Sequence, residues 1–258
     1  MRRLSGLVLL LALVAALLVV PGPAEAGGPS AVAAVAVVPA RAGAALEVRV
    51  IGRSVKGRAI RAWHLGDPSS PVKAVFLASM HGNEPRPARI LESLRDGPPI
   101  TGADIWVVPT MNPDGLHRHT RKNARGVDLN RNFPVRWIRQ HGAYNSGRRP
   151  ASEPETRAMM RFLRAVRPAY VVSFHQPLYG VDTSYWKTRT LALALSENLQ
   201  LPRKRFTCNH RCHGTLTQWF NKRLPGAAIT VEYGARMTWR QKYVTGPTGL
   251  LSSVGASR

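Results

Sequence analysis

The stretch VKAVFLASMHGNE, residues 72–84, carries the strongest structural signal in this sequence of 258 residues. Its first eight residues form a largely apolar run, which predicts a buried β-strand over 72–79. The run ends in a polar segment that places His81 and Glu84 three residues apart. An imidazole and a carboxylate directly after a buried strand are either an ordinary surface loop or half of a metal site.

Similar runs recur along the chain and alternate with helical patterns. Period-two alternation on both sides of Gly57 predicts a β-hairpin over 46–66. Further strands are predicted at 104–109, 169–174 and 227–233, and helices at 88–96, 152–168, 190–199 and 215–224. Apolar strands that alternate with helices predict an α/β fold, with a mixed, largely parallel twisted sheet and helices on both of its faces.

Three further local expectations concern the segments between and after these elements. The helix at 152–168 is expected to begin with a capping box of Ser152 and Glu155. The segment 112–152 is a long loop, and in a compact domain such a loop is usually functional or disordered. Residues 235–258 show no clear amphipathic helix.

The N-terminus differs in composition from the rest of the chain. A basic start, an apolar run of 14 residues and small residues at positions 24 and 26 predict a secretory signal peptide over 1–26. The run is shorter than the roughly 20 residues of a membrane span, so no stable membrane insertion is expected after cleavage. An uncleaved anchor is the alternative. Residues 27–45 are predicted to be a linker or disordered segment, and 46–258 one domain.

Charge is the most unusual property of the composition. The formal net charge is +23, and residues 114–149 contain nine Lys or Arg against two acidic residues. Such a field favours a polyanionic neighbour. For an exported protein that neighbour is expected to be an anionic cell envelope, and no nucleic acid is expected. A soluble, arginine-rich surface without a polyanionic partner is the alternative.

Cys208 and Cys212 are the two cysteines of the chain. In an oxidising compartment a close pair predicts a disulfide. A zinc knuckle with the nearby His210 and His213, or free thiols, are the alternatives.

Chemically capable residues lie at the ends of three predicted strands. His81 and Glu84 follow one strand, His175 follows another, and Glu232 lies at the end of a third. Ligands of α/β sheets bind at the carboxyl ends of strands. Two His and one carboxylate are a known catalytic zinc set. Glu232 then fits the second carboxylate, which takes a proton from water and passes it to the leaving nitrogen.

The motifs around these residues resemble a known family. They are MHGNE (80–84), NPDG (112–115), RKNARGVDLNRNFP (121–134) and ITVEYG (229–234). Together they are similar to the zinc carboxypeptidases, also called funnelins. The resemblance implies a zinc carboxypeptidase-like fold, a catalytic domain over 46–258, and a hydrolase of peptide bonds. It implies one zinc ion bound by His81, Glu84 and His175.

The resemblance also implies roles for residues outside the zinc set. Glu232 would act as general base and then as general acid. Arg121 would polarise the scissile carbonyl and stabilise the oxyanion. Asn130 and Arg131 would grip a free carboxylate of the substrate, a task that suits the planar fork of arginine. Asp128 would orient the first zinc histidine.

Within the family, the chain is most similar to the murein peptide amidase A group. The segments concerned are SEPETRA (152–158), SFHQPL (173–178), CHGTLTQWFN (212–221) and ITVEYG (229–234). That group cuts the γ-D-glutamyl–meso-diaminopimelate bond, so a cell-wall peptide and a secreted or cell-envelope location are expected. An ordinary carboxypeptidase that trims peptides is the first alternative. A non-catalytic polyanion or cell-wall binding protein is the second. Neither Tyr179 nor Tyr185 aligns with the substrate-covering tyrosine of digestive members.

Overall fold

The structure, a computed structural model, describes residues 45–208 and 211–258. The predicted signal peptide and residues 27–44 of the predicted linker lie outside these ranges. Within them, no helix combines the length and the apolar character needed to cross a bilayer.

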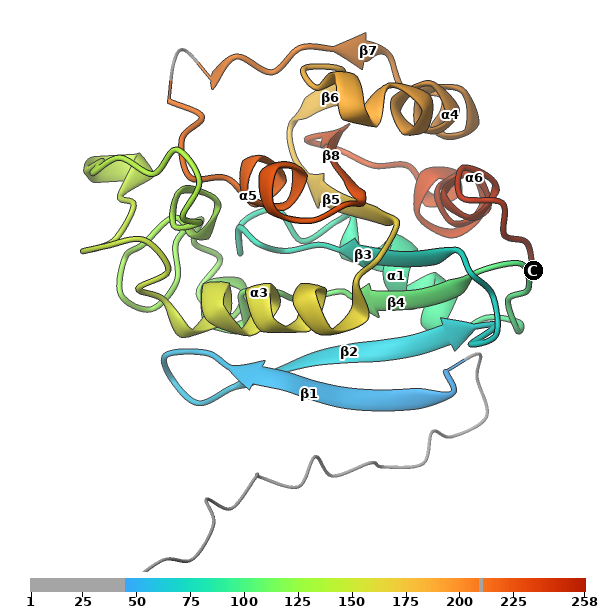
Figure 1. Cartoon of the computed structure of the whole chain (residues 1–258), viewed down its shortest axis with the longest axis horizontal. Coiled ribbons are helices and arrows are strands. Elements are labelled where there is room, and N and C mark those ends of the chain that lie inside the picture. The colour runs from blue at the N-terminus through green and yellow to red at the C-terminus, as the bar shows by residue number, and fades with distance from the viewer. Residues whose placement is uncertain (1–44, 209–210) are drawn as a thin grey trace, which may run out of the picture. The chain divides into compact units, whose positions relative to one another are not determined.

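The described residues build a mixed sheet of eight strands in the order β1-β2-β4-β3-β5-β8-β6-β7 (Figure 1). Four neighbouring pairs are parallel and three are antiparallel. The strands are β1 (Glu47–Arg53), β2 (Ala59–Gly66), β3 (Lys73–Leu77), β4 (Asp104–Val108), β5 (Tyr170–His175), β6 (Leu178–Asp182), β7 (Arg203–Lys204) and β8 (Ala227–Gly234).

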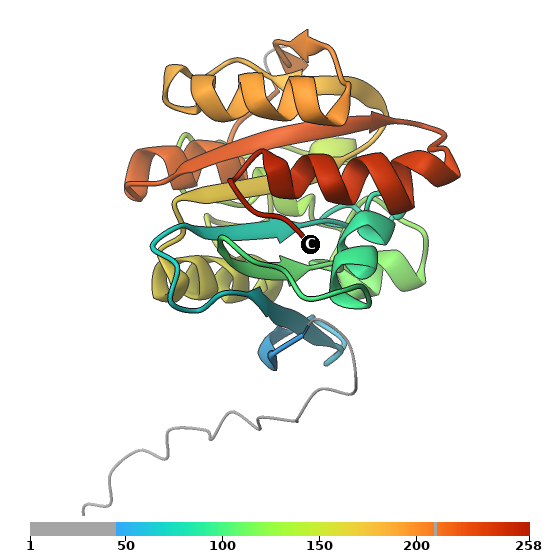
Figure 2. The ribbon, with the colours of Figure 1, turned by 90° about the vertical axis from the view of Figure 1, so that its right-hand side faces the viewer.

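Helices cover both faces of this sheet. Those of the described residues are α1 (Ala88–Arg95), α2 (Pro113–His117), α3 (Pro154–Val166), α4 (Arg189–Leu199), α5 (Leu216–Arg223) and α6 (Gly246–Ser252). The core on one face includes residues of α1, α4 and α6, and the core on the other includes residues of α3 and α5. In Figure 1 α3 and α5 lie in front of the sheet, and in Figure 2 α4 and α6 face the viewer. The predicted α/β class is confirmed.

Strand β3 shows why both faces must be covered. Phe76 belongs to the core with α1, α4 and α6, whereas Val75 and Leu77 belong to the core with α3 and α5. All three side chains are fully buried. A strand that is apolar on both sides is stable only between two layers. Because β3, β5 and β8 are parallel neighbours, their carboxyl ends meet at one edge of the sheet.

The predicted capping box of Ser152 and Glu155 is wrong. Helix α3 begins after Glu153, and no described side chain caps it. The Glu155 carboxylate instead accepts hydrogen bonds from the Val55 amide and the Asn123 side chain, at 3.1 and 3.2 Å. Glu155 therefore joins the β1–β2 hairpin to the long loop before α3, and this tertiary contact outweighs the local cap.

The C-terminal segment also differs from expectation. A π-helical turn (Gln241–Thr245) leads into α6, which packs against α1 and α4. Leu250 and Leu251 are buried there. Gly249 lies so close to the Asn198 carbonyl that a β-carbon would clash with it. Glycine is a poor helix former, so the residue that permits this close packing also weakens the helical signal of the sequence.

Helix α5 carries the capping box that the structure does contain. The Thr215 side chain accepts a hydrogen bond from the Gln218 amide, and the Gln218 side chain accepts one from the Thr215 amide. We expect Thr215→Ala to lower the free energy of unfolding by about 1 kcal/mol, because it removes the partner of a helix N-terminal amide. Thr190→Ala, at an exposed position of α4, is the control and should cost much less. Equal losses in urea denaturation would contradict the assignment.

Candidate active site

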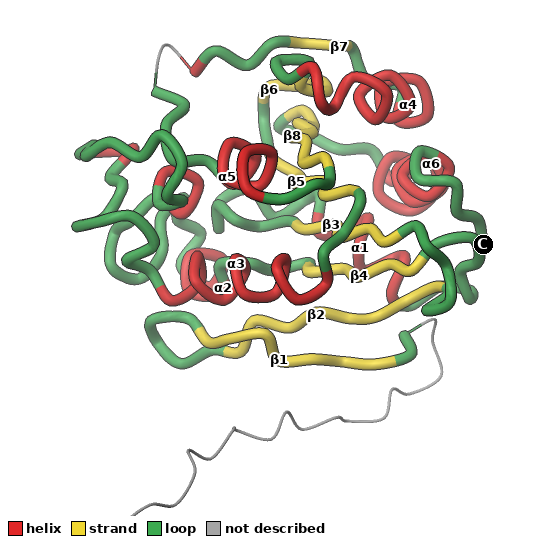
Figure 3. The backbone as a smooth tube through the Cα atoms, viewed as in Figure 1, coloured by secondary structure: helices red, strands yellow, loops and turns green. Residues whose placement is uncertain are grey.

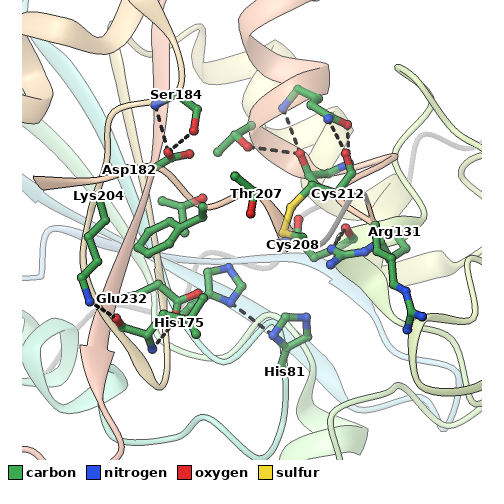
Figure 4. A pocket seen from close by; sticks show the side chains of 18 of the residues that line it. His81, Arg131, His175, Asp182, Ser184, Lys204, Thr207, Cys208, Cys212 and Glu232 are labelled. Carbon is green, nitrogen blue, oxygen red and sulfur yellow. Dashed lines mark hydrogen bonds between the residues drawn. A yellow bond between two sulfur atoms is a disulfide. The ribbon is translucent and has the colours of Figure 1, made fainter.

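His81, Glu84 and His175 converge at the edge where β3 and β5 end. Figure 4 shows the two imidazoles side by side, with Glu232 close to His175. All three are buried. Nδ1 of His81 lies 2.9 Å from Oε1 of Glu84, and Nδ1 of His175 lies 2.9 Å from Oε2. The two Nδ1 atoms are 3.2 Å apart. The three side chains therefore direct two nitrogens and one carboxylate at one position that a metal ion could occupy, which we call the metal point.

The outer nitrogens of the two imidazoles test whether a metal fits this point. Nε2 of His81 lies 3.0 Å from the Asp128 carboxylate, and Nε2 of His175 lies 3.0 Å from the Ser173 hydroxyl. When these nitrogens carry the protons, the lone pairs on both Nδ1 atoms point at each other and at Glu84. Such an arrangement suits a cation bound between the two imidazoles and the carboxylate. The set of two imidazoles and one carboxylate suits zinc.

The carboxylate of Glu84 lies within 2.9 Å of a nitrogen of each imidazole. Burial by itself would raise its pKa, but the adjacent His81 and His175 outweigh burial and hold the pKa well below its usual value. The Gln176 backbone amide also donates a hydrogen bond to Oε2 at 3.2 Å.

Two closely packed glycines fix the path of the chain between His81 and Glu84. Gly82 lies against the backbone of Gly115 in the NPDG motif, where a β-carbon on Gly82 would clash with it. A β-carbon on Gly115 would clash with the Asn112 side chain and the Lys122 carbonyl. Asn112 caps the N-terminus of α2, since its side chain accepts from the Gly115 amide at 2.9 Å, and it also donates to the Met80 carbonyl at 3.2 Å. The HGNE and NPDG motifs are thus two halves of one packing contact.

Glu232 lies beside this set on β8, in register with His175 on β5. It is 9% exposed, and its Oε2 accepts a hydrogen bond from the Leu178 amide at 3.2 Å. Burial raises the pKa of Glu232 above its ordinary value. A carboxylate with a raised pKa, next to a metal point, is suited to accept and donate protons.

Asp128 connects the metal point to the long loop. Its carboxylate, fully buried, accepts from Nε2 of His81, from Nε of Arg121 at 2.9 Å and from the Asn130 amide at 3.0 Å. NH1 of Arg121 then lies 3.4 Å from Oε1 of Glu84. Burial alone would raise the pKa of Asp128, but the hydrogen bond from His81 and the charge of Arg121 lower it below its usual value.

Asn130 and Arg131 lie in a short 3-10 helix (Leu129–Arg131) on the same cleft. Oδ1 of Asn130 accepts a hydrogen bond from the Leu216 amide, which fixes the direction of its side chain. Arg131 is 4% exposed, and its buried Nε has no hydrogen-bond partner among the described residues. A guanidinium with a free donor that lines a cleft can accept a carboxylate.

The cleft itself has a volume of about 740 Å³. Its wall contains residues that the sequence analysis did not single out, among them Tyr144 and Asp182. The guanidinium of Arg131 lies 5.2 Å from the centre of the Tyr144 ring. No motif points to Tyr144, because it ends a short 3-10 helix (Gly142–Tyr144) in the segment before α3, which is mostly loop (Figure 3). None points to Asp182, because β6 is a short strand with weak periodicity.

The tyrosines and the cysteine pair considered from the sequence can also be located relative to this cleft. Tyr185 contributes to its wall, whereas Tyr179 is 42% exposed and does not. Cys208 and Cys212 are joined by a disulfide, and both line the cleft.

Comparison with known proteins identifies the family. The profile of the zinc carboxypeptidases matches residues 99–223. Murein peptide amidase A of Vibrio campbellii is 31% identical over 196 residues, which cover 70% of this chain and 77% of the relative. The chain belongs to the zinc carboxypeptidase family. The predicted family is thus confirmed, and zinc is the metal of that family.

Other zinc carboxypeptidase relatives extend this finding. Murein peptide amidase A of Escherichia coli is 37% identical over 146 residues, and this match spans 51% of the chain and 60% of the relative's length. The crystal structure of the murein-tripeptide amidase from E. coli O157 superposes with a TM-score of 0.65 at 27% identity, covering 79% of this chain and 91% of that one. Carboxypeptidase A of Helicoverpa armigera, at 17% identity, shares the fold with a TM-score of 0.67 and coverage of 82% and 69%.

The contact between Gly82 and Gly115 generates a prediction. Gly82→Ala should force the loop away from the NPDG turn, because overpacking against backbone costs about 1–3 kcal/mol. We expect a lower melting temperature and at least roughly tenfold weaker zinc retention, since the ligand loop carries His81 and Glu84. Gly234→Ala is the control, because the nearest atom to its β-carbon would be 3.5 Å away. Dialysis against a chelator followed by metal analysis measures the effect, and unchanged retention would refute it.

Proposed function

We propose that this protein is a secreted zinc-dependent peptidase that hydrolyses an amide bond next to a free carboxylate. The proposed bond is the γ-D-glutamyl–meso-diaminopimelate bond of cell-wall peptides. One observation carries the proposal: the buried set of His81, Glu84 and His175 shares a single cleft with Glu232 and Arg131. This cleft therefore combines a metal-binding site, a general base that can also act as an acid, and a side chain that can bind a carboxylate.

His81, Glu84 and His175 would hold the zinc ion. When bound, zinc acidifies the attacking water and polarises the scissile carbonyl. The hydrogen bonds of Asp128 to His81 and of Ser173 to His175 would keep both imidazoles aimed at the metal.

Glu232 would carry the proton. The Leu178 amide holds one of its oxygens, so the other is free to face the attacking water. Because burial raises its pKa, Glu232 can accept a proton from the water and release it to the leaving nitrogen. Both transfers use one carboxylate, which must lie between the water and the leaving group.

Arg121 would stabilise the negative charge that develops on the carbonyl oxygen. The two bonds from its guanidinium to Asp128, at 2.9 and 2.8 Å, fix its orientation. A donor that is already oriented does not need to reorganise as charge develops, which makes it effective in a cleft. Its side chain is 28% exposed, so substrate can reach it.

Asn130 and Arg131 would hold the free carboxylate of the residue after the scissile bond. Arg131 is buried and retains a free donor, while Asn130 is fixed by the Leu216 amide. A bidentate contact with a carboxylate adds orientation as well as affinity. The enzyme would thereby place the scissile bond at a set distance from the substrate's carboxylate.

Several observations support a cell-wall peptide as the substrate. Relatives that share 31% and 37% identity are murein peptide amidases. The predicted signal peptide would export the chain, and its net charge of +23 would favour an anionic envelope. The shared fold of Helicoverpa carboxypeptidase A supports a second candidate, an ordinary carboxypeptidase acting on C-terminal residues of peptides.

Replacement of the proton carrier tests the chemistry. Glu232→Gln should retain zinc but lower turnover by several orders of magnitude, because the amide cannot accept a proton. The assay is mass spectrometry of products from L-Ala-γ-D-Glu-meso-diaminopimelate, with and without a zinc chelator. Glu197→Gln, on the exposed side of α4, is the matched control.

The outcomes separate the candidate functions. Chelator-sensitive release of free diaminopimelate by the wild type supports the proposal. No release from a zinc-loaded protein favours ordinary C-terminal peptides. Peptide binding that weakens with salt and does not change in Glu232→Gln would point to a non-catalytic polyanion-binding protein.

Arg131→Ala tests the carboxylate anchor. We expect it to weaken transition-state binding by about 1.5–3 kcal/mol for substrates with a free carboxylate next to the scissile bond, the range for hydrogen bonds to charged groups. The loss should be small for the amidated analogue. Arg223→Ala, exposed on α5 and outside the cleft, is the control. Equal losses in kcat/KM on the free and amidated substrates would rule out this role.

A further inference from the structure

The cationic segment 114–149 contains more positive charge than the proposed chemistry uses. Of its nine Lys and Arg residues, the proposed mechanism employs Arg121 and Arg131. Three of the others, Arg125, Arg139 and Arg148, line a second cavity with a volume of about 480 Å³. No described residue lines both this cavity and the active-site cleft. The segment therefore forms a cationic hollow of its own.

Two of these three guanidinium groups have no acidic partner. The carboxylate of the cavity wall belongs to Glu153, which is buried, accepts from the Ser152 hydroxyl at 2.6 Å and lies 3.7 Å from NH1 of Arg125. None of the ion pairs within residues 45–208 and 211–258 includes Arg139 or Arg148. NH2 of Arg139 instead donates to the Arg148 carbonyl at 2.8 Å, which holds one cation against a residue of the same sign. An anion bound between them would relieve this repulsion.

Hydrogen bonds fix the shape of the cavity before any ligand arrives. The hydroxyl of Ser146, a fully buried residue, accepts from the Gln140 amide at 2.8 Å and donates to the Ile138 carbonyl at 2.9 Å. The Asn145 side chain donates to the Gly126 carbonyl at 2.8 Å. These contacts tie the two cationic parts of the segment together. A preformed site binds its ligand at a lower cost in conformational entropy.

The cavity also contains a hydrogen-bond donor that lacks a partner. Gln140 lines the cavity, and its buried Nε2 has no hydrogen-bond partner among the described residues. Leaving such a donor unpaired is costly, so a ligand that accepts from it gains affinity. A tetrahedral phosphate directs its oxygens to several sides, whereas a carboxylate presents two oxygens in one plane. Donors from four separate positions of the chain therefore favour a phosphate group.

Exposed cations extend the positive charge beyond the cavity. Arg149, next to Arg148, and Arg136 are both exposed on the same segment. A polymer with a repeating negative charge can contact these side chains and the cavity at once, whereas a free anion occupies the cavity alone. The net charge of +23 adds long-range attraction for such a polymer.

We propose that the cavity of Arg125, Arg139 and Arg148 binds a phosphate group of an anionic phosphodiester polymer of the cell envelope. Tyr144 lines the active-site cleft and its neighbour Asn145 lines the cavity, so a bound polymer would hold the cleft close to the envelope. This binding does not require the peptidase chemistry. The choice of an envelope polymer rests on the proposed secretion.

Three probes separate the possible sources of the anion. They are poly(glycerol phosphate), polygalacturonate of similar length and inorganic phosphate, each titrated into the zinc-loaded wild type at equal concentrations of anionic groups. Calorimetry should show the tightest binding for poly(glycerol phosphate). The affinity should fall as the salt concentration rises, because salt screens exposed charges.

A pair of double variants separates the cavity from the general charge of the protein. Arg139→Met, Arg148→Met should weaken the binding of poly(glycerol phosphate) by at least about tenfold, because two contacts to charged groups are lost. Arg161→Met, Arg223→Met is the control, since both side chains are exposed and lie outside the cavity and the cleft. It removes the same charge and should change the affinity less than about twofold, because distant charges are screened. Both double variants should cleave the soluble tripeptide at the wild-type rate.

Several results would overturn the proposal. Equal weakening by the two double variants would show that the attraction is diffuse, and no binding of poly(glycerol phosphate) at low salt would remove the site altogether. Equal or tighter binding of polygalacturonate would refute the preference for phosphate. Equal binding of inorganic phosphate would refute the polymer. Tripeptide cleavage is measured separately, so each of these results leaves the proposed peptidase intact, and loss of cleavage leaves the polymer binding measurable.

A lysine pair decides if the methionine pair does not fold in a thermal melt. Arg139→Lys, Arg148→Lys keeps both charges but removes the planar forks that match phosphate oxygens. We expect its affinity for poly(glycerol phosphate) to be at least about threefold weaker than that of the wild type. An unchanged affinity would overturn the site.

Discussion

The buried carboxylate of Asp128 is the interaction on which the candidate site depends. Its two oxygens serve a histidine of the metal point, the guanidinium of Arg121 and the backbone of Asn130. A fully buried charge is costly unless every oxygen is hydrogen-bonded, so these partners cannot move independently. One carboxylate thereby couples the end of strand β3 to the long loop that carries the proposed substrate contacts.

Both the parallel and the antiparallel strands of the sheet contribute residues to the cleft. The parallel strands β3, β5 and β8 bring their carboxyl ends to one edge, where His81, His175 and Glu232 meet. Beyond β8 the pairing becomes antiparallel, and β6 adds a wall that runs past Glu232 to Asp182. The proposed zinc ligands and Glu232 therefore lie at the ends of the parallel strands, and the antiparallel extension contributes side chains to the wall of the same cleft.

The residues that could be predicted from sequence share a local signature. His81, Glu84 and His175 stand where apolar runs end, and Glu232 stands at the end of another, so periodicity alone located the edge. Arg121, Asn130 and Arg131 were located by motif resemblance, because nothing in a loop's periodicity marks them. The capping box of Ser152 and Glu155 failed because Glu155 is taken by Val55 and Asn123, about 100 and 30 residues away in sequence.

The sequence by itself determined the α/β class, the strand ends and the donor types, because hydrophobic period and residue chemistry are local properties. Only the tertiary structure decided which side chains share a cleft. Asp182 and Lys204 line the same cleft as Glu232 because β6 and β7 pair beyond β8. Gly82 matters because Gly115 packs against it. Strand order and contacts between distant segments depend on how the whole core packs, so no short window of sequence contains them.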